Sequence, residues 1–463
     1  ACGGENDDPS GTDSRGIVVP VIRPEEMSGK DFIIIQHQPE ISPFGYAENS
    51  QLAERAFKRM EDVEALYGCT LNFSTVPYDN NFVTQIQAFA YEENSGDLIF
   101  SSNNAMLRRC VGTGGDDSML VSLLPYDSIL DFWNTEKWGN ITAKETMMYG
   151  KDFYGVTPAL WINYLPLPYY YLVYNRDLLE SFGQTDLQEY YENGTWTRDV
   201  MMDIVISCYD DTGAVPIYGM AAHLSHMIRA SFLAAGCTPV QIDSINVDGT
   251  SEWTNGWLLP EAEEALTWLQ GKIKSNPRCF NGGKNVGTWS AHEGFIAQEA
   301  VMCLTSPITI LNNIVVDAAF SYGIMPWGGF EPNYMSGYYE NVCTVAIPTF
   351  AQNAEWSAFL MADLFEGLDG TPDYNSVLEY YRNTYFDTDT DMEILIQQGS
   401  NNLQYSYWPN NGDATLGAIA GSFLSSSVTA LLQANAGLVD SVVETYILPN
   451  KIALEQYKAE GKY

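Results

Sequence analysis

The sequence predicts an α/β protein with two lobes, and three observations support this prediction. Short apolar runs of strand type alternate with amphipathic helical segments over residues 31–100. A second group of strand and helix patterns begins after Tyr154, and no clean linker separates the two groups. We therefore expect the chain to pass between the lobes more than once. The predicted boundaries are a flexible tether over residues 1–27, lobe I over residues 28–160 and 325–372, and lobe II over residues 161–324 and 373–463.

The first group of elements indicates a parallel sheet. Residues 31–35 and 70–76 are typical of strands, and residues 53–66 carry apolar side chains at helical spacing. A second helix is predicted through residues 83–90, before a short strand at residues 97–100. This alternation implies a parallel sheet with helices on both faces, and ligands bind such sheets beyond the carboxyl ends of the strands. We expect three loops to share that rim, namely residues 42–46, 77–80 and 101–104.

The second group begins with a strand over residues 170–175 and a helix over residues 176–182 that Gly183 ends. Another helix opens near Trp196, where Thr195 or Thr197 is a plausible N-cap. A further helix is expected from Pro260, because proline favours the first helical position.

Composition and charge exclude several classes of protein. Apolar residues make up 46% of the 463 residues and aromatic residues 13%, which excludes disorder over most of the length. The net charge of −37 repels phosphate backbones, so we expect no nucleic-acid partner. The longest charge-free stretch, residues 414–439, has too many hydroxyl and amide groups to face lipid, and we predict buried helices there.

Motifs of catalysis and metal binding are missing. The sequence has no GxxxxGK[ST] loop, no HExxH and no GxSxG. Residues 387–391 begin like a calcium loop but have Met392 and Gln398 where glycine and glutamate are needed, so we predict a solvated turn. His223 and His226 could share a helical face and bind a metal, but no further ligands lie nearby, and we predict no metal and no cofactor. Carboxylate pairs of a glycoside hydrolase stay possible among 59 acidic residues.

Cysteine spacing gives no zinc site and no disulfide framework, because no CxxC pair occurs. Cys237, Cys303 and Cys343 lie in apolar runs and are expected to be small core residues.

Aromatic residues crowd two stretches, residues 161–171 and 327–339. Most tyrosine and tryptophan rings fill the edges of a core. Rings in loops rich in asparagine and glycine also suit a hydroxylated ligand, because they pack against its C–H groups while amides and hydroxyls bind its oxygens. Both interpretations stay open for each ring.

Six segments occur in a characteristic order along the chain, namely 153–158 (FYGVTP), 172–183 (LVYNRDLLESFG), 194–197 (GTWT), 294–302 (GFIAQEAVM), 322–326 (YGIMP) and 353–359 (NAEWSAF). In this order they resemble the motifs of extracellular solute-binding proteins (family 1, carbohydrate type) of bacterial ABC transporters. One motif departs from the family, since Gln298 stands where glycine is usual. The likeness covers roughly residues 30–365, and the last hundred residues match weakly.

The resemblance implies a two-lobed periplasmic-binding-protein-like fold (class II, Venus-flytrap) in which the lobes close by a hinge motion over a solute. Position by position, it implies a ligand site with no catalytic residue. The aromatic residue that the family often presents after its "AAM" helix is replaced here by Ser306, and Trp408 could supply that ring. The implied contacts are Phe44, Tyr46, Tyr78, Asn80, Ser101, Asn103, Asn104, Trp161, His223, His226, Ser306, Trp327, Tyr338, Tyr339 and Trp408.

The first four residues, Ala-Cys-Gly-Gly, resemble the end of a bacterial lipoprotein box, with Cys2 as the lipidated residue. Ala1 departs from that pattern, in which the cysteine comes first. Together these features predict a monomeric, lipid-anchored protein at the extracellular face of the cytoplasmic membrane, or in the periplasm. It would deliver an oligosaccharide to the permease subunits of an ABC importer. The alternatives are a secreted glycoside hydrolase and a glycan-binding surface protein that feeds no transporter.

Overall fold

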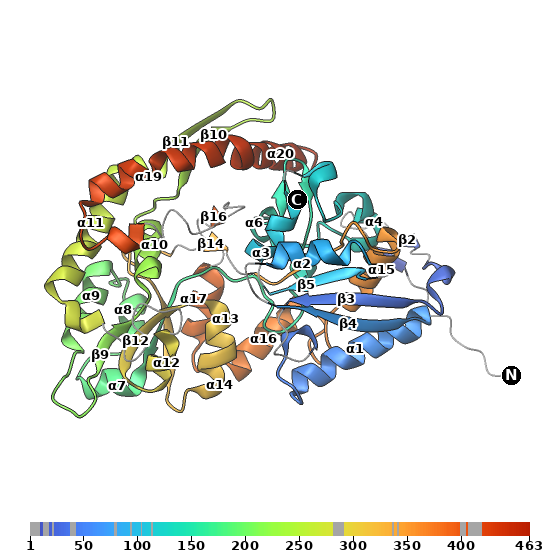
Figure 1. Ribbon diagram of the computed structural model, residues 1–463. Coiled ribbons are helices and arrows are strands. Elements are labelled where there is room, and N and C mark those ends of the chain that lie inside the picture. The colour runs from blue at the N-terminus through green and yellow to red at the C-terminus, as the bar shows by residue number, and fades with distance from the viewer. Residues whose placement is uncertain are drawn as a thin grey trace. The chain divides into compact units, whose positions relative to one another are not determined.

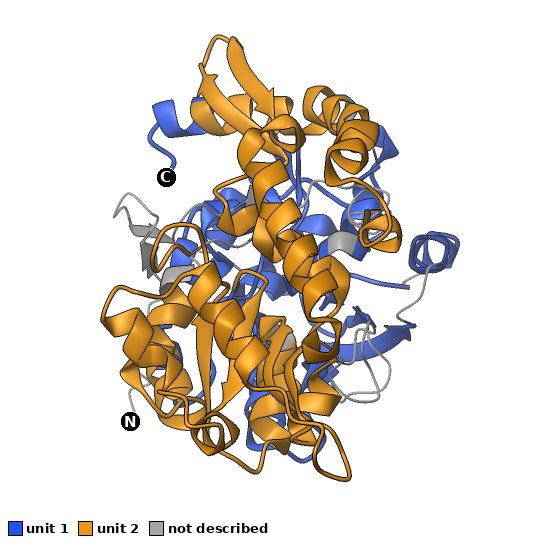
Figure 2. Cartoon of the chain, turned by 90° about the vertical axis from the view of Figure 1, so that its left-hand side faces the viewer, with its two compact units in different colours: residues 1–166, 341–377, 456–463 blue, residues 167–340, 378–455 orange. Residues whose placement is uncertain are grey.

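The computed structural model divides the chain into two compact units (Figure 2). Unit 1 comprises Ala1–Pro166, Asn341–Val377 and Gln456–Tyr463, and unit 2 comprises Leu167–Glu340 and Leu378–Glu455. Residues 161–166, 373–377 and 456–463, which we expected in lobe II, fall in unit 1, and residues 325–340, which we expected in lobe I, fall in unit 2. The functional lobe boundaries stay a prediction. The structure describes residues 10–12, 18–20, 23–37, 43–77, 81–92, 95–102, 104–112, 114–280, 291–335, 338–339, 342–398, 404–405 and 419–463.

A four-stranded sheet forms the centre of unit 1 (Figure 1). Its strands are β3 (Asp31–His37), β4 (Thr70–Val76), β5 (Leu98–Ser101) and β15 (Thr344–Ala346). β3 pairs in parallel with β4 and β5, which confirms the predicted parallel core. β15 pairs antiparallel with β5, so the complete sheet is mixed.

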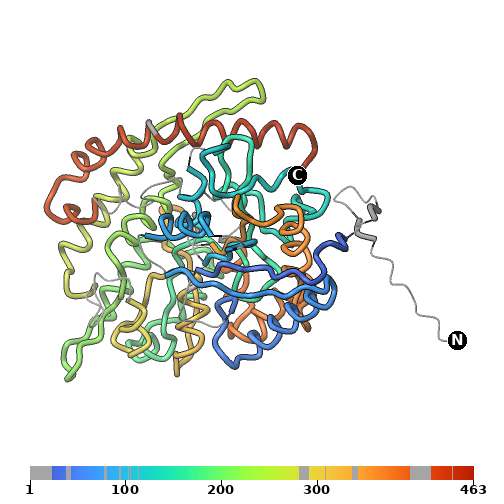
Figure 3. The backbone as a smooth tube through the Cα atoms, turned by 45° about the vertical axis from the view of Figure 1, so that its right-hand side comes forward, coloured from blue at the N-terminus to red at the C-terminus, as the bar shows by residue number. Residues whose placement is uncertain are grey.

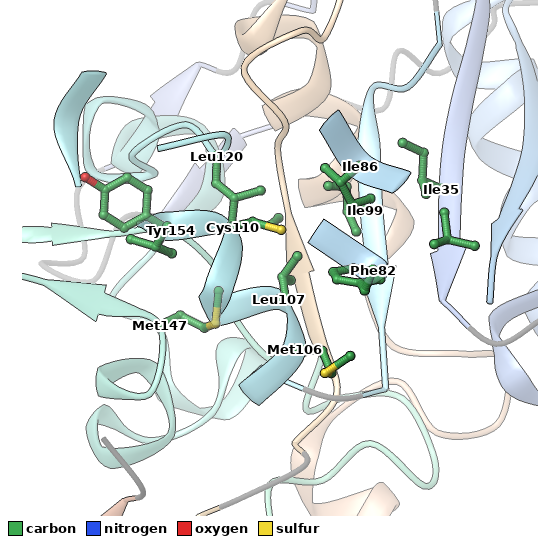
Figure 4. Close-up of a cluster of buried hydrophobic side chains, with 13 residues drawn as sticks. Ile35, Phe82, Ile86, Ile99, Met106, Leu107, Cys110, Leu120, Met147 and Tyr154 are labelled. Carbon is green, nitrogen blue, oxygen red and sulfur yellow. The ribbon is translucent and has the colours of Figure 1, made fainter. Parts of the chain in front are cut away.

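Helices cover both faces of this sheet. Successive side chains of β3 point to opposite faces, and each face packs against helices. Phe32 packs edge-on against Trp356 of α15 (Ala354–Leu364), and their ring centroids lie 6.4 Å apart. Ile35 faces the other way, into a buried cluster formed with α2 (Phe82–Phe89) and α3 (Asn104–Arg108). Figure 4 shows Phe82 and Leu107 within this cluster, which is the core on that face.

The remaining helices of unit 1 are short, apart from the amphipathic helix α1 (Gln51–Tyr67), which Ser50 caps. The Ser50 side chain accepts a hydrogen bond of 3.1 Å from the N–H of Ala53. Two-stranded pairs β1–β2 and β6–β7 complete the regular structure. These elements are α4 (Asp127–Leu130), α5 (Thr135–Trp138), α6 (Ile141–Glu145), β1 (Ser10–Thr12), β2 (Val18–Pro20), β6 (Met148–Tyr149) and β7 (Asp152–Phe153).

Unit 2 contains a second mixed sheet, in the order β13-β8-β12-β9. β8 runs antiparallel to both of its neighbours, whereas β12 and β9 are parallel. The predicted helices are present: α7 follows β8 directly, and α9 begins after Thr197, whose side chain accepts from the N–H of Val200. The strands are β8 (Tyr171–Asn175), β9 (Tyr218–Ala221), β12 (Ala300–Thr305) and β13 (Tyr322–Pro326), and the first helices are α7 (Arg176–Ser181), α8 (Leu187–Glu192), α9 (Arg198–Ser207), α10 (Leu224–Ala234) and α11 (Pro260–Ser275).

The chain beyond residue 235 adds a hairpin and further helices. The Asn255 side chain donates to the carbonyl of Ala436 over 2.8 Å and joins the hairpin to α19, and the two lie side by side in Figures 1 and 3. These elements are β10 (Val240–Ile245), β11 (Ser251–Asn255), α12 (Ala291–Ile296), α13 (Pro307–Thr309), α14 (Val315–Asp317), β14 (Tyr338–Tyr339), α16 (Tyr374–Thr384), α17 (Asp389–Gln398), β16 (Gln404–Tyr405), α19 (Val428–Val442) and α20 (Leu448–Ala459). Within the described ranges, no helix is both long enough and apolar enough to cross a bilayer.

The prediction of a solvated turn at residues 387–391 is wrong, because α17 begins there and Asp391 is fully buried. Its carboxylate accepts hydrogen bonds of 2.8 Å from the N–H of Ile324 and 2.7 Å from Gln188, and it pairs with Arg176 at 3.4 Å. Burial raises the pKa of Asp391, and these partners oppose that rise. The carboxylate therefore attaches α17 to β13 instead of facing water.

The core of unit 1 contains a buried cation, Lys144 of α6. The side chain is 1% exposed, and its Nζ has no hydrogen-bond partner among the described residues. Nζ lies 5.1 Å from the centroid of the Phe132 ring. Burial lowers the pKa of Lys144 from 10.5 to about 7, while the nearby charges of Asp131 and Asp127 oppose this effect.

Lys144 makes stability depend on pH in the alkaline range. Between pH 7 and 10.5 the unfolded chain binds a proton that the folded chain does not, so the free energy of unfolding rises with pH over that window. We expect Lys144→Met to stabilise the protein at pH 6 by a few kcal/mol, with about 1.4 kcal/mol for each pKa unit as the guide. The variant should also flatten the rise, measured by urea unfolding from pH 6 to 10. Lys30→Met, at an exposed position, is the control, and an unchanged rise in Lys144→Met would contradict this account.

Candidate ligand-binding site

Polar side chains meet at one edge of the sheet in unit 1, where β3 and β5 both end. The Nδ1 of His37, the last residue of β3, lies 2.9 Å from the Oγ of Ser101, the last residue of β5. The His37 ring also packs on Phe82, with centroids 4.4 Å apart. Asn104 opens α3 beside them, and its Oδ1 accepts from the N–H of Val342 over 3.1 Å. The structure therefore places Ser101 and Asn104 at the expected rim, where both are buried.

Three predicted aromatic contacts of unit 1 lie in its core. Phe44 has 0% exposure, and its ring makes edge contacts with Phe73, Phe100 and Trp161 at centroid distances of 5.0, 5.6 and 4.9 Å. Trp161 is also fully buried and donates from Nε1 to the carbonyl of Glu366 over 2.9 Å. A ring with no exposed surface offers no face to a solute, so Phe44 and Trp161 act here as packing residues.

Tyr46 belongs to the same cluster, because its hydroxyl donates to the carbonyl of Ile162 over 2.6 Å and its side chain is 3% exposed. Tyr164, which was not among the predicted contacts, is half-buried, and its hydroxyl donates to the carbonyl of Phe44. Its ring lies 5.3 Å from Phe100. Tyr164 and Phe73 are thus the half-buried members of this cluster, and the place of Tyr164 in the aromatic-rich stretch 161–171 is the sequence signal that indicated it.

The directions of the strands in unit 2 bring four loops to one edge of its sheet. Tyr171 at the start of β8 pairs with Thr305 at the end of β12 and with Pro326 at the end of β13. Because β9 is parallel to β12, it ends at that edge as well. The segments before β8 and after β9, β12 and β13 therefore meet there. These segments contain Tyr169 and Tyr170, His223 to His226, Ser306, and Trp327, respectively.

The N-terminus of α10 contributes two histidines. His223 is the N-cap, and its Nδ1 accepts from the N–H of Ser225 over 3.3 Å and lies 2.6 Å from the Ser225 Oγ. Since Nδ1 accepts, neutral His223 carries its proton on Nε2 and can donate from that atom. His226 is 7% exposed, and its ring lies 5.3 Å from that of Tyr170 and 5.5 Å from that of His223.

At this edge Arg229 carries a positive charge, whereas His226 does not. Burial lowers the pKa of His226 well below 6.5, and the Arg229 and His223 charges lower it further, so His226 is neutral at pH 7. The Nη1 of Arg229 donates to the Tyr170 hydroxyl over 3.0 Å, and Tyr170 has a positive φ of 77°. Tyr170 belongs to the aromatic stretch whose rings the sequence left open as core residues or ligand contacts, whereas Arg229 lies in an apolar helical run and was not singled out from the sequence.

Two further predicted contacts of unit 2, Ser306 and Trp327, follow strands that end at this edge. Ser306 is the N-cap of α13, and its Oγ accepts from the N–H of Thr309 over 3.2 Å. Trp327 is 3% exposed and lies in a separate crevice between the loop after β13 and the helices α9, α10 and α11. For Tyr338 and Tyr339 the structure gives only the backbone, which forms strand β14, paired with β16. Tyr78, Asn80, Asn103, Trp408 and Cys2 lie outside the described residues.

The arrangement around His223 and His226 suits uncharged hydroxyl groups. Neutral imidazoles both donate and accept hydrogen bonds, and Tyr169 adds an aromatic ring 6.3 Å from His226. Tyr170 is 1% exposed, so its role here is to pack against His226 and to accept from Arg229. Within the part of the chain that the structure describes, no group of three or more His, Cys, Asp or Glu side chains could hold a metal ion.

Acid should destabilise unit 2 through His226. As pH falls below 6.5 the unfolded chain takes up a proton that the buried ring does not, so the free energy of unfolding decreases. We expect His226→Phe, which keeps a ring beside Tyr170, to lose less stability between pH 7 and 5 than the parent chain in urea titrations. His292→Phe is the matched control, since His292 is only half buried and its pKa is lowered less strongly. An equal acid response in the parent and His226→Phe would show that the assignment is wrong.

Comparison with protein-family models and with curated proteins finds no match. Solved structures do match over most of the chain. The cyclo/maltodextrin-binding protein complexed with maltotetraose is 13% identical with a TM-score of 0.60, over 90% of this chain and 97% of that one. UgpB from Mycobacterium tuberculosis in complex with glycerophosphocholine is 13% identical with a TM-score of 0.61, over 89% and 98%.

An ABC transporter solute-binding protein from Thermotoga lettingae TMO, bound with α-D-tagatose, is 15% identical with a TM-score of 0.53, over 92% of this chain and 100% of that one. Identities this low establish shared architecture only. The two α/β units predicted from the ordered motifs are confirmed, and the chain has the fold of ABC transporter solute-binding proteins.

Proposed function

We propose that this protein is the substrate-binding component of a bacterial ABC importer, which captures an extracellular carbohydrate and delivers it to the permease. The observation that carries the proposal is the group of neutral hydrogen-bonding side chains and aromatic rings at one sheet edge of unit 2. Tyr170 directly precedes β8, which begins at that edge. The strands β9 and β12 end there and are followed by His223 and His226 and by Ser306, respectively. The fold supports the proposal, because proteins with this fold include binders of maltotetraose and α-D-tagatose.

Chemistry favours a sugar as the solute. Sugar hydroxyls both donate and accept hydrogen bonds, and a neutral imidazole can match either role at its two nitrogens. Aromatic rings such as Tyr169 pack against the C–H groups of a sugar ring. UgpB in its complex holds glycerophosphocholine, so a polar solute that is not a sugar is the alternative that experiment must separate.

We expect binding without cleavage of the solute. A hydrolase needs two carboxyl groups facing one linkage, at separations of roughly 5 to 10 Å. The residues that we place at the edge of the unit 2 sheet are histidines, tyrosines, a serine and an arginine, and none of them is a carboxylic acid. Release of reducing ends from a polysaccharide on incubation with the protein would instead support the hydrolase alternative.

The proposed partners follow from the importer function. They are the permease subunits, reached by a monomer held at the extracellular face of the membrane, or free in the periplasm. A lipid on Cys2 would provide the anchor. Neighbouring permease genes would favour this function over that of a glycan-binding surface protein.

Calorimetry tests the choice of ligand. Maltotetraose, other oligosaccharides, α-D-tagatose and glycerophosphocholine should be titrated separately, and we expect at least one sugar to bind at micromolar strength, roughly −8 kcal/mol. Binding of glycerophosphocholine alone would keep the class of protein and reject the sugar. If no solute binds, the proposal loses its main support.

A variant locates the binding residues. His223→Ala removes a half-buried donor at the N-terminus of α10, and we expect about tenfold weaker sugar binding, since a hydrogen bond in such a site is worth on the order of 1–2 kcal/mol. His292→Ala, which changes a histidine elsewhere in unit 2, should bind the sugar like the parent. Equal affinity of both variants would place the sugar elsewhere.

A further inference from the structure

A crevice in unit 2, separate from the histidine site, is partly closed by a stacked guanidinium. Arg198 opens α9, and its Cζ lies 3.4 Å from the ring centroid of Phe330 and 5.0 Å from that of Trp268. Its Nη2 donates to the Oε1 of Glu264 over 3.0 Å. Its Nη1 is buried and has no acceptor among the described residues. Arg198, Trp268 and Phe330 keep partial exposure and form the rim.

Two further unsatisfied polar groups lie on the floor of the crevice. Ser231 of α10 is 4% exposed and Trp327 is 3% exposed, and neither the Ser231 Oγ nor the Trp327 Nε1 has a hydrogen-bond partner in the described part of the chain. Leaving such a group unpaired costs about 1–3 kcal/mol. Three residues that carry a polar atom without a partner in the described ranges, on three elements distant in sequence, therefore line one crevice.

Backbone packing keeps this arrangement in place. Gly328 lies so close to α9 that a Cβ there would come within 2.7 Å of the Arg198 Cα. The N–H of Arg198 also donates to the carbonyl of Gly329 over 2.8 Å. The loop after β13 thus keeps the backbones of Gly328 and Gly329 against that of Arg198, so the residues on either side of this contact share the crevice.

We propose that this crevice binds a planar carbonyl group with a small apolar end, such as the acetyl group of an acetamido compound or of acetate. The indole N–H and the guanidinium can only donate, and the serine hydroxyl can do so as well, so the occupant must accept. The methyl groups of Ala234 and Ala265 also line the crevice and suit a methyl group. Glu264 already pairs with Arg198, and the chain carries a net charge of −37, so an uncharged carbonyl should bind more tightly than an anion.

The dimensions of the crevice require one side chain to move. In the structure the crevice is too narrow to admit a water molecule. Entry therefore needs the Arg198 or Phe330 side chain to swing away from the rim, where both keep partial exposure.

This site differs from the one proposed for the sugar. Ser231 lies five residues beyond His226 on α10, a rise of about 7.5 Å along the helix. The inference does not depend on the carbohydrate function, and loss of either site should leave the other intact.

The test uses the full chain labelled with ¹⁵N, so that each indole N–H gives a separate NMR signal. Acetamide and sodium acetate are titrated separately, with sodium chloride as the control for ionic strength. We expect acetamide to shift the Trp327 indole signal in a saturable way, and Ser231→Ala to weaken that binding about tenfold. Affinity for the sugar should not change in Ser231→Ala.

Matched control variants test whether acetamide binds in the crevice and not at other buried polar groups. Trp257→Phe and Ser357→Ala remove buried polar atoms that also lack partners but lie outside the crevice, and both should bind acetamide like the parent. Trp327→Phe lacks the indole signal, so binding to it is followed by the melting temperature. We expect acetamide to raise the melting temperature of the parent and to leave that of Trp327→Phe unchanged. The proposal is overturned if neither probe perturbs Trp327, if Ser231→Ala binds acetamide unchanged, or if a crystal structure grown with acetamide shows no acetamide in the crevice.

Discussion

The directions in which the strands run determine where the polar side chains of this protein gather. In unit 1, the parallel pairing of β3 with β5 places His37 and Ser101 at the same edge. In unit 2, β8 is antiparallel to β12, so the residues that precede β8 meet those that follow β12. A slip of one residue in either register would turn every side chain of the strand to the opposite face, and the buried faces prevent this. The candidate site depends on this constraint more than on any single contact.

Aromatic residues divide between packing and the candidate site. The ring of Phe44 packs against those of Phe100 and Trp161, and all three are buried. Burial of each such ring stabilises the fold by about 1.5–3 kcal/mol. Phe44 reaches this position through a left-handed backbone conformation, with φ of 63°. This packed cluster supports the half-buried Tyr164.

Local patterns predicted the elements well, because periodicity and capping are local properties. The strand at β3, the helix α1 and the cap at Thr197 follow from apolar spacing and from a residue type that commonly caps helices. Contacts between distant segments were not predictable in this way. Asp391 looked like a turn residue, because its partner Arg176 lies 215 positions away, and the antiparallel addition of β15 has no local signal.

The candidate site was predicted in part, for the same reason. Strand order along the chain indicated the loop that carries Ser101, and the resemblance to solute-binding proteins indicated the segments that carry His223 and Ser306. Composition could not separate a buried ring such as Trp161 from an exposed one. Histidine is an unusual N-cap, so neither the role of His223 nor its fixed tautomer could be foreseen. Arg229 and Tyr170 meet only through the fold.

The central claim is that the histidines and tyrosines at the edge of the unit 2 sheet hold an intact, uncharged sugar. A crystal structure of the protein grown with a bound oligosaccharide tests it most directly. The account predicts sugar density with hydroxyls within hydrogen-bond distance of the His223 Nε2 and a sugar ring packed on Tyr169. Density elsewhere in the molecule, or a linkage flanked by two carboxylic acids, would contradict it.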